Sequence, residues 1–186
     1  MIENFDLTVF HFLNGLLHHS PLLDWIILFF AQYYVFVIVL VFLVALYKLP
    51  TSKKERWKVF FVTGAITIIA RFGIMPLIYL FDQRLRPFIA LQAPHLFVVS
   101  TYAFPSGHTT FVFALATIAW YYHEKVAYFL YASGLVIGIA RVIAGVHYPS
   151  DILGGIIVGT VVAYILMLIA QKLLPTHIAF IKKRNL

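Results

Sequence analysis

Long apolar stretches without charge constrain this chain more than any other feature of its sequence. A helix needs roughly 20 mostly apolar residues to cross the hydrocarbon core of a bilayer, and several stretches of the 186-residue chain are of that kind. Only 11% of the residues are charged and 62% are hydrophobic, whereas soluble domains carry about 25% charged residues. We therefore expect an all-α integral membrane protein, folded as a single transmembrane domain over residues 1–186.

Polar breaks and prolines divide the chain into an N-terminal segment and about five spans. Residues 1–20 alternate apolar and polar positions, which predicts an amphipathic helix lying in the membrane interface. The third span is short, since each helical residue adds only about 1.5 Å. The predicted spans are 22–47, 59–81, 107–122, 126–144 and 150–172.

The distribution of positive charge predicts how the bundle is oriented. Lysine and arginine concentrate in residues 48–58, in the turn 123–125 and in the tail Lys182–Arg184, and such connections usually stay in the cytoplasm. In a protein of the cell (plasma or inner) membrane, the loops 82–105 and 145–149 are then extracytoplasmic, and the C-terminus is cytoplasmic. The net charge of +7 forms no basic stripe, so we expect no nucleic-acid partner.

Side chains suited to phosphate chemistry gather on the predicted extracytoplasmic face. Arginine presents a planar fork of donors that binds phosphate oxygens in pairs, and a helix N-terminus offers free N–H groups and positive dipole charge. The spans bring both kinds of group to this face. The residues concerned are Arg84, Arg86, Ser106, Gly107, His108, Arg141, His147 and Asp151. Together they predict an anion site, and a phosphate site in particular.

Two histidines at one anion site can divide the roles of nucleophile and acid. Asp151 follows His147 by four residues and can hold the Nδ1–H of its ring, so that Nε2 faces phosphorus. Carboxylates on this face are few and scattered, whereas a two-metal hydrolase needs a cluster of them. Cysteine ligands are excluded because the chain has no cysteine. We therefore expect catalysis without a metal or another cofactor.

The spacing of these residues resembles the three-part signature of the type 2 phosphatidic acid phosphatase superfamily, which includes bacterial undecaprenyl diphosphate phosphatases and, more distantly, vanadium haloperoxidases. Residues 105–108 match its Pro-Ser-Gly-His segment in full. Residues 79–87 resemble Lys-x6-Arg-Pro, and residues 140–151 resemble Ser-Arg-x5-His-x3-Asp. The resemblance covers residues 79–151.

The resemblance implies a role for each matching residue. His147 would attack phosphorus and form a phosphohistidine, with Asp151 orienting its ring. His108 would protonate the departing oxygen and later activate water. The oxygens of the phosphoryl group would be held by Arg86, Arg141, Ser106 and Gly107.

Two positions depart from the family pattern. Tyr79 stands where the family has lysine, which removes one phosphate-binding cation. Arg84 is a candidate to supply that charge, and the sequence leaves this open. Ala140 replaces the serine before the arginine of the third segment, which would remove a supporting hydrogen bond and not a catalytic group.

Arg71 falls inside the second predicted span and belongs to none of the three segments. A charge in the membrane costs at least about 2.5 kcal/mol on insertion scales, so its side chain should face the interior of the bundle. We expect a buried structural ion pair there. Contact with a substrate diphosphate is the alternative.

The motifs select a phosphoryl group and do not identify a lipid tail. The compact chain and its likeness to small bacterial enzymes favour a polyprenyl (undecaprenyl) diphosphate phosphatase that acts at the outer leaflet. Phosphatidylglycerophosphate and phosphatidate are alternative substrates. A lipid transporter is the alternative from another class, but transporters place ionisable groups near the midplane. The sequence does not define an oligomeric state.

Overall fold

Helices account for all regular structure in residues 2–48 and 52–173, the part of the chain that the computed structural model describes. The predicted basic tail lies outside these residues. The helical elements are α1 (Ile2–Asn14), α2 (Pro21–Leu28), η1 (Phe29–Tyr33), α3 (Tyr34–Tyr47), α4 (Lys53–Ile68), η2 (Ile69–Ile74), α5 (Met75–Tyr79), α6 (Pro87–Ala90), α7 (Gly107–Tyr122), α8 (Glu124–Ile143) and α9 (Pro149–Leu173). The elements η1 and η2 are π-helical turns inside longer helices.

Within residues 2–48 and 52–173, four continuous helices are long and apolar enough to cross a membrane. They are Pro21–Tyr47, Lys53–Tyr79, Glu124–Ile143 and Pro149–Leu173. The remaining predicted span is α7, whose 16 residues reach about 24 Å at 1.5 Å per residue. The all-α membrane fold is therefore confirmed, with a short fifth helix among four long ones.

The second long helix begins earlier than the predicted start at residue 59. Ser52 caps it, because its hydroxyl accepts the N–H of Glu55 at 3.2 Å. This is the serine-x-x-glutamate arrangement that satisfies N–H groups left free at a helix start. The charged first turn of α4 is therefore part of the helix and not a connection.

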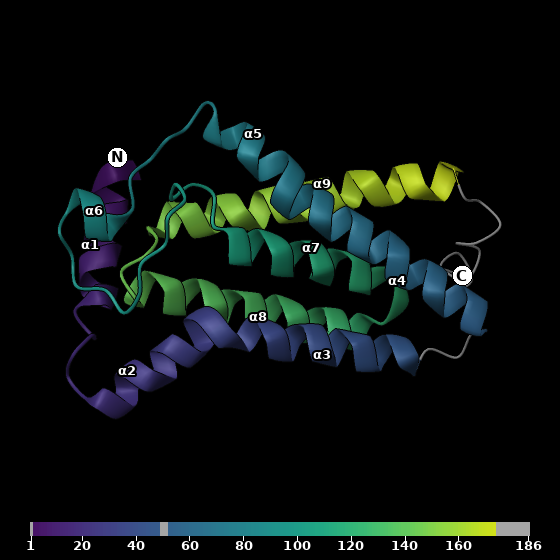
Figure 1. Cartoon of the computed structure of the whole chain (residues 1–186), viewed down its shortest axis with the longest axis horizontal. Coiled ribbons are helices and arrows are strands. Elements are labelled where there is room, and N and C mark those ends of the chain that lie inside the picture. Colours follow the sequence, from purple (N-terminus) through teal and green to yellow (C-terminus); the bar gives the residue numbers. More distant parts are fainter. Residues whose placement is uncertain (1, 49–51, 174–186) are drawn as a thin grey trace.

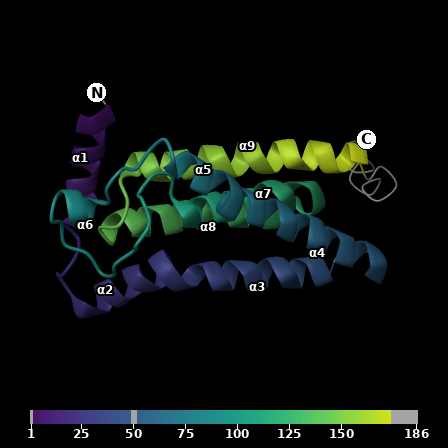
Figure 2. The ribbon, with the colours of Figure 1, turned by 45° about the horizontal axis from the view of Figure 1, so that its top comes forward.

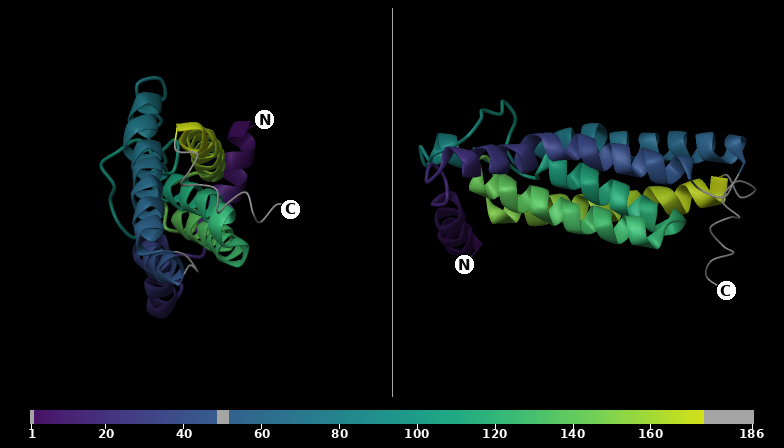
Figure 3. Two further views of the ribbon diagram at one scale, coloured as in Figure 1. Left: turned by 90° about the vertical axis from the view of Figure 1, so that its right-hand side faces the viewer. Right: turned by 90° about the horizontal axis from the view of Figure 1, so that it is seen from below.

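The central helix of the bundle is α7, most of whose residues are buried. It packs along α8 and α9, and the helices α2–α3 and α4–α5 lie together on one side of this group (Figures 1, 2 and 3). The backbones of α7 and α9 approach closely at two glycines. A Cβ on Gly155 would lie 2.8 Å from the carbonyl oxygen of Ser106, and one on Gly159 would lie 2.4 Å from that of Thr110. This approach fixes the start of α9 beside the start of α7.

Helix α1 lies across one end of the bundle, which we call the α1 end (Figures 1 and 3). A helix in residues 1–20 was predicted to lie in the membrane interface, and its position in a bilayer stays a prediction. In the structure α1 is also packed onto the bundle, because Phe10 is fully buried and packs against Tyr148, with 5.6 Å between ring centroids. The side-chain amide of Asn14 donates to the carbonyl oxygens of Pro94 and Ile143, both at 2.9 Å. These hydrogen bonds hold α1 against the loop before α7 and against the end of α8.

Candidate active site

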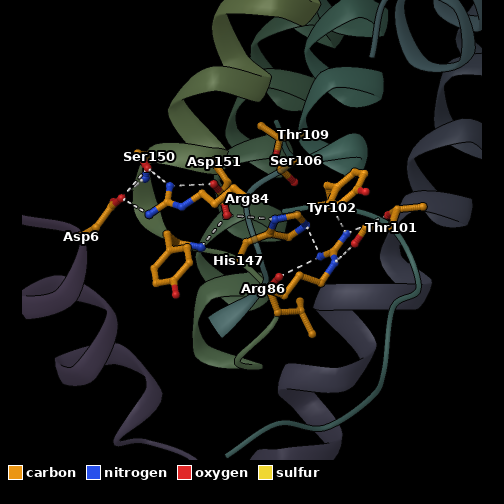
Figure 4. A network of polar contacts seen from close by, with 12 residues as sticks. Asp6, Arg84, Arg86, Thr101, Tyr102, Ser106, Thr109, His147, Ser150 and Asp151 are labelled. Atoms are coloured by element: carbon orange, nitrogen blue, oxygen red, sulfur yellow. Dashed lines mark hydrogen bonds and ion pairs between the residues drawn. The ribbon is translucent and has the colours of Figure 1, made fainter. Parts of the chain in front are cut away.

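The predicted site residues come together at the α1 end of the bundle. The antiparallel packing of α7, α8 and α9 brings the start of α7, the end of α8, the loop 144–148 and the start of α9 to that end (Figure 1). The loop between α5 and α7 closes over them. Figure 4 shows how the side chains of this region point toward one another.

His147 and Asp151 form a buried pair at the start of α9. Their side chains are 1% and 0% exposed, and Nδ1 of the histidine lies 3.3 Å from Oδ2 of the aspartate. The same carboxylate oxygen accepts the N–H of Tyr148 at 2.8 Å. His147 lies in the loop before α9 and Asp151 in the first turn of that helix, so the loop and the helix fix the ring orientation together.

The other ring nitrogen of His147 faces Arg86. Nε2 lies 3.1 Å from Nη1 of that arginine, and a guanidinium can only donate. We therefore assign Nε2 as the acceptor, which leaves the ring proton on Nδ1, where Asp151 accepts it. In this tautomer Nε2 carries no proton, and its electron pair accepts from Arg86.

The charge state of His147 agrees with this tautomer. Burial lowers its pKa well below the ordinary value for histidine, and the guanidinium groups of Arg141 and Arg86 lower that pKa further. The imidazole is therefore neutral at neutral pH. A neutral imidazole with a free Nε2 is the form that can attack an electrophile.

Arg86 holds the loops around the site together. Its five N–H groups donate to Thr101 (backbone and hydroxyl), Tyr102, Val146 and Nε2 of His147, at 2.7–3.1 Å. Burial lowers the pKa of Arg86 to about 10, so it stays charged at neutral pH. Nη1 of Arg86 donates to Nε2 of His147, the atom that would bear a phosphoryl group. The same N–H group could donate to a phosphoryl oxygen after a small movement.

Unpartnered donors gather around the start of α7. Ser106 is fully buried and makes no side-chain cap, so the first-turn N–H groups of this helix have no cap acceptor. Arg141 is 3% exposed and donates from Nη1 to the carbonyl oxygen of Ala31 at 2.8 Å, but its Nε is buried without an acceptor. Free N–H groups at a helix start, next to an unsatisfied guanidinium, suit an anion.

Arg84 lies on the other side of Asp151 from His147 (Figure 4). It donates to Oδ1 of Asp151 at 3.0 Å and to Oδ2 of Asp6 at 2.7 Å. Burial alone would lower its pKa, but the hydrogen bond to Asp6 and the charge of Asp151 hold that pKa above the ordinary value. Its role as a phosphate ligand stays a prediction, and these contacts favour a role in orienting Asp151.

Asp6 is the part of this network that the sequence did not indicate. It is 1% exposed, and it accepts the backbone N–H of Ser150 at 2.8 Å as well as the hydroxyl of the same residue. Helix α1 therefore reaches the first turn of α9 through a buried carboxylate. The sequence of α1 contains two acidic residues, Glu3 and Asp6, and its pattern does not single out Asp6.

The described residues contain no group of three or more histidine, aspartate and glutamate side chains that could hold a metal ion. The polar groups of the site are instead arginine, histidine and helix N–H donors. The donor set therefore suits an oxyanion better than a cation.

A helical membrane bundle with a buried His–Asp pair, arginines and a free helix start at one end defines a membrane phosphatase of the PAP2 type. Residues 57–175 match the PAP2 superfamily, and the chain belongs to that superfamily. The matched region contains every predicted site residue. Asp6 lies outside it.

Three relatives extend the likeness over most of the chain. Undecaprenyl-diphosphatase BcrC of Bacillus subtilis (strain 168) is 29% identical over 171 residues, which cover 90% of this chain and 85% of that protein. The putative undecaprenyl-diphosphatase YbjG of Escherichia coli (strain K12) is 27% identical and covers 87% and 80%. The bacitracin transport permease protein BcrC of Bacillus licheniformis is 26% identical and covers 92% and 84%.

Two solved structures share the fold. LpxE of Aquifex aeolicus superposes with a TM-score of 0.62 at 28% identity, covering 88% of this chain and 94% of that one. A PAP2-type phosphatidylglycerolphosphate phosphatase of Bacillus subtilis gives a TM-score of 0.60 at 18% identity, covering 89% and 86%. At that identity the second likeness concerns the fold alone.

Proposed function

We propose that this phosphatase hydrolyses a polyprenyl diphosphate, undecaprenyl diphosphate in particular, to the monophosphate and inorganic phosphate at the extracytoplasmic face of the membrane. The observation that carries the proposed chemistry is the buried pair of His147 and Asp151, with the unprotonated Nε2 facing Arg86. The diphosphate substrate is supported by two relatives named as undecaprenyl-diphosphatases.

In the first step, the electron pair on Nε2 of His147 attacks the terminal phosphorus. A P–N bond forms, the bond from phosphorus to the bridging oxygen breaks, and its electron pair leaves with the lipid monophosphate. Asp151 accepts the Nδ1–H and stabilises the positive charge that develops on the ring. His108 donates a proton to the departing oxygen.

In the second step, His108 takes a proton from water, and the resulting nucleophile attacks the phosphohistidine. The P–N bond breaks, its electron pair returns to Nε2, and inorganic phosphate leaves. In both steps Arg86, Arg141 and the first N–H groups of α7 neutralise the equatorial oxygens, which is electrostatic stabilisation of the transition state. The reaction needs no metal ion in this scheme.

A phosphatase for phosphatidylglycerophosphate or phosphatidate is the second candidate within the family, because the site residues select a phosphoryl group and do not identify a lipid tail. A transporter is the candidate from another class, because one relative is named a transport permease. Against transport, the described site gathers its ionisable groups at one end of the bundle, where a reaction with a membrane-anchored headgroup takes place.

A phosphate-release panel on the purified protein tests the proposal. It compares polyprenyl diphosphate, polyprenyl monophosphate, phosphatidylglycerophosphate and phosphatidate in the same detergent, with and without EDTA. We expect the highest kcat/KM for polyprenyl diphosphate and no effect of EDTA. Faster turnover of a glycerolipid would contradict the substrate, and loss of activity in EDTA that Mg²⁺ restores would contradict the metal-free mechanism.

A further inference from the structure

Arg71 lies in the π-helical turn η2, and its side chain packs against the start of α7. A Cβ on Gly107 would lie 2.5 Å from Nε, 2.6 Å from Cζ and 2.8 Å from Nη2 of Arg71. The guanidinium therefore occupies the space that a side chain at residue 107 would need. It lies directly beside the helix start that the site offers to an anion.

The structural ion pair expected for Arg71 is not found in the described part of the chain. The ion pairs there involve other residues, and the ring contact of Arg71 is with Phe72, 5.0 Å from Cζ to the ring centroid. A guanidinium within a membrane span and without a carboxylate needs another source of negative charge.

Two other guanidinium groups lie near Arg71. Its own guanidinium is close enough to act electrostatically on those of Arg86 and Arg141. Like charges gathered in a site with little water repel one another, so the cluster is stabilised when an anion binds among them. A phosphoryl group carries the required charge and has oxygens for several donors.

The π-helical turn explains how a residue outside the family segment reaches the site. Eight residues separate Arg71 from Tyr79, and at about 100° per residue a regular α-helix would place them roughly 80° apart. A π-turn accommodates one extra residue, which reduces the difference to about 20°. Tyr79 also faces the site loop, since its ring lies 5.8 Å from that of Tyr102. The two residues therefore share a face.

We propose that Arg71 binds the phosphoryl group of the substrate and supplies the cation that the family places at the position of Tyr79. Its guanidinium and the N–H groups at the start of α7 approach the same oxygens. Gly107 is required because any side chain there would displace the guanidinium. This proposal rests on the phosphoryl site proposed above. It does not depend on which lipid tail the substrate carries.

Orthovanadate inhibition and lipid turnover test this role together. Vanadate occupies a phosphoryl site whatever the tail, so its inhibition constant reports on the site even if the polyprenyl substrate is wrong. A charge-assisted hydrogen bond is worth about 1.5–3 kcal/mol, so Arg71→Ala should lower kcat/KM and weaken vanadate inhibition, each by about 10- to 100-fold. Arg71→Lys should retain part of both.

Relocating the charge provides the matched controls. Tyr79→Lys in the Arg71→Ala background should recover part of the vanadate affinity, which a purely structural role would not allow. Lys54→Ala removes an exposed cation from the same helix and should change neither quantity. If Arg71→Ala does not fold, Arg71→Gln is measured in its place. Unchanged vanadate inhibition in the folded variant overturns the proposal, whether or not turnover falls.

Discussion

Nε2 of His147 lies 3.1 Å from Nη1 of Arg86, with the histidine ring turned so that Nδ1 meets Asp151. Once Nε2 is bonded to phosphorus, this arginine donor is close enough to donate to a phosphoryl oxygen instead. The same contact therefore fixes the tautomer before the reaction and provides a donor during it. Both roles require a fixed guanidinium, and the hydrogen bonds from Arg86 to Thr101 and Tyr102 hold it in place.

Replacing the nucleophile should stop turnover without unfolding the protein. We expect His147→Ala to lower kcat by a factor of at least about 10³, because the covalent route is lost and only binding and electrostatic stabilisation remain. Phosphate release measures the rate, and acid-labile radioactive phosphate on the quenched wild-type enzyme detects the intermediate. His11→Ala removes an exposed histidine on α1 and should be silent. Normal phosphate release by His147→Ala would exclude the assignment.

The tautomer and charge of His147 can be observed directly. Because burial and two arginines lower its pKa well below the ordinary value, the ring should stay neutral as the pH falls from 7.5 through about 6.5, where a free histidine gains a proton. ¹⁵N NMR of histidine-labelled protein, assigned with His147→Ala, should show an Nδ1–H tautomer throughout. A signal that titrates near pH 6.5 would contradict the described geometry.

The lowered pKa of His147 also makes the stability of the fold depend on pH. The unfolded chain binds a proton at this histidine below about pH 6.5 and the folded chain does not, so stability falls as the pH decreases below that value. His147→Gln removes the titrating group. The variant should therefore lose less stability than wild type between pH 7 and pH 5, measured by thermal unfolding in detergent. Equal losses would show that the buried ring takes up its proton in the folded state.

The sequence predicted the site because local patterns specify it. Gly107 was expected to begin a helix, and α7 begins there, since a proline and a serine precede it. His147 and Asp151 are four residues apart on either side of the start of α9, so their contact is local. Such relationships depend on a few neighbouring residues, and the packing of α7, α8 and α9 then brings the segments together.

Contacts between segments that are distant in the chain could not be predicted from the sequence. The bond from Asp6 to Ser150 joins residues 144 apart, and nothing in residues 1–20 indicates which side of α1 is buried. For Arg71 the sequence left two roles open, an ion pair and contact with the substrate, because a π-turn changes which residues share a helix face. Regular periodicity cannot anticipate that change.

The contacts of Arg84 predict that it positions Asp151 and does not bind phosphate. Arg84→Ala and Asp6→Asn should each lower kcat by about 10-fold, as is usual when a group that orients a catalytic residue is removed. Vanadate inhibition should stay close to that of wild type, in contrast to Arg71→Ala. A large loss of vanadate affinity in Arg84→Ala alone would instead identify Arg84 as the substitute for the family lysine.

The absence of cysteine makes the orientation of the bundle directly measurable. Val98 is 72% exposed in the loop at the α1 end, and Lys125 is exposed at the opposite end of α7. A membrane-impermeant maleimide should label Val98→Cys in intact cells and Lys125→Cys only after permeabilisation. The reverse pattern would place the site in the cytoplasm and contradict an extracytoplasmic reaction.

The role of His108 should depend on the leaving group. A polyprenyl diphosphate releases a phosphate monoester, which leaves readily without a proton, whereas phosphatidate releases an alcohol, which needs one. General acid catalysis contributes about 10²- to 10⁴-fold where the proton is required. His108→Ala should therefore slow the first step less with the diphosphate than with phosphatidate, as measured by single-turnover phosphoenzyme formation. Because water activation in the second step is the same for both substrates, dephosphorylation should slow equally, and equal losses in the first step would exclude His108 as the acid.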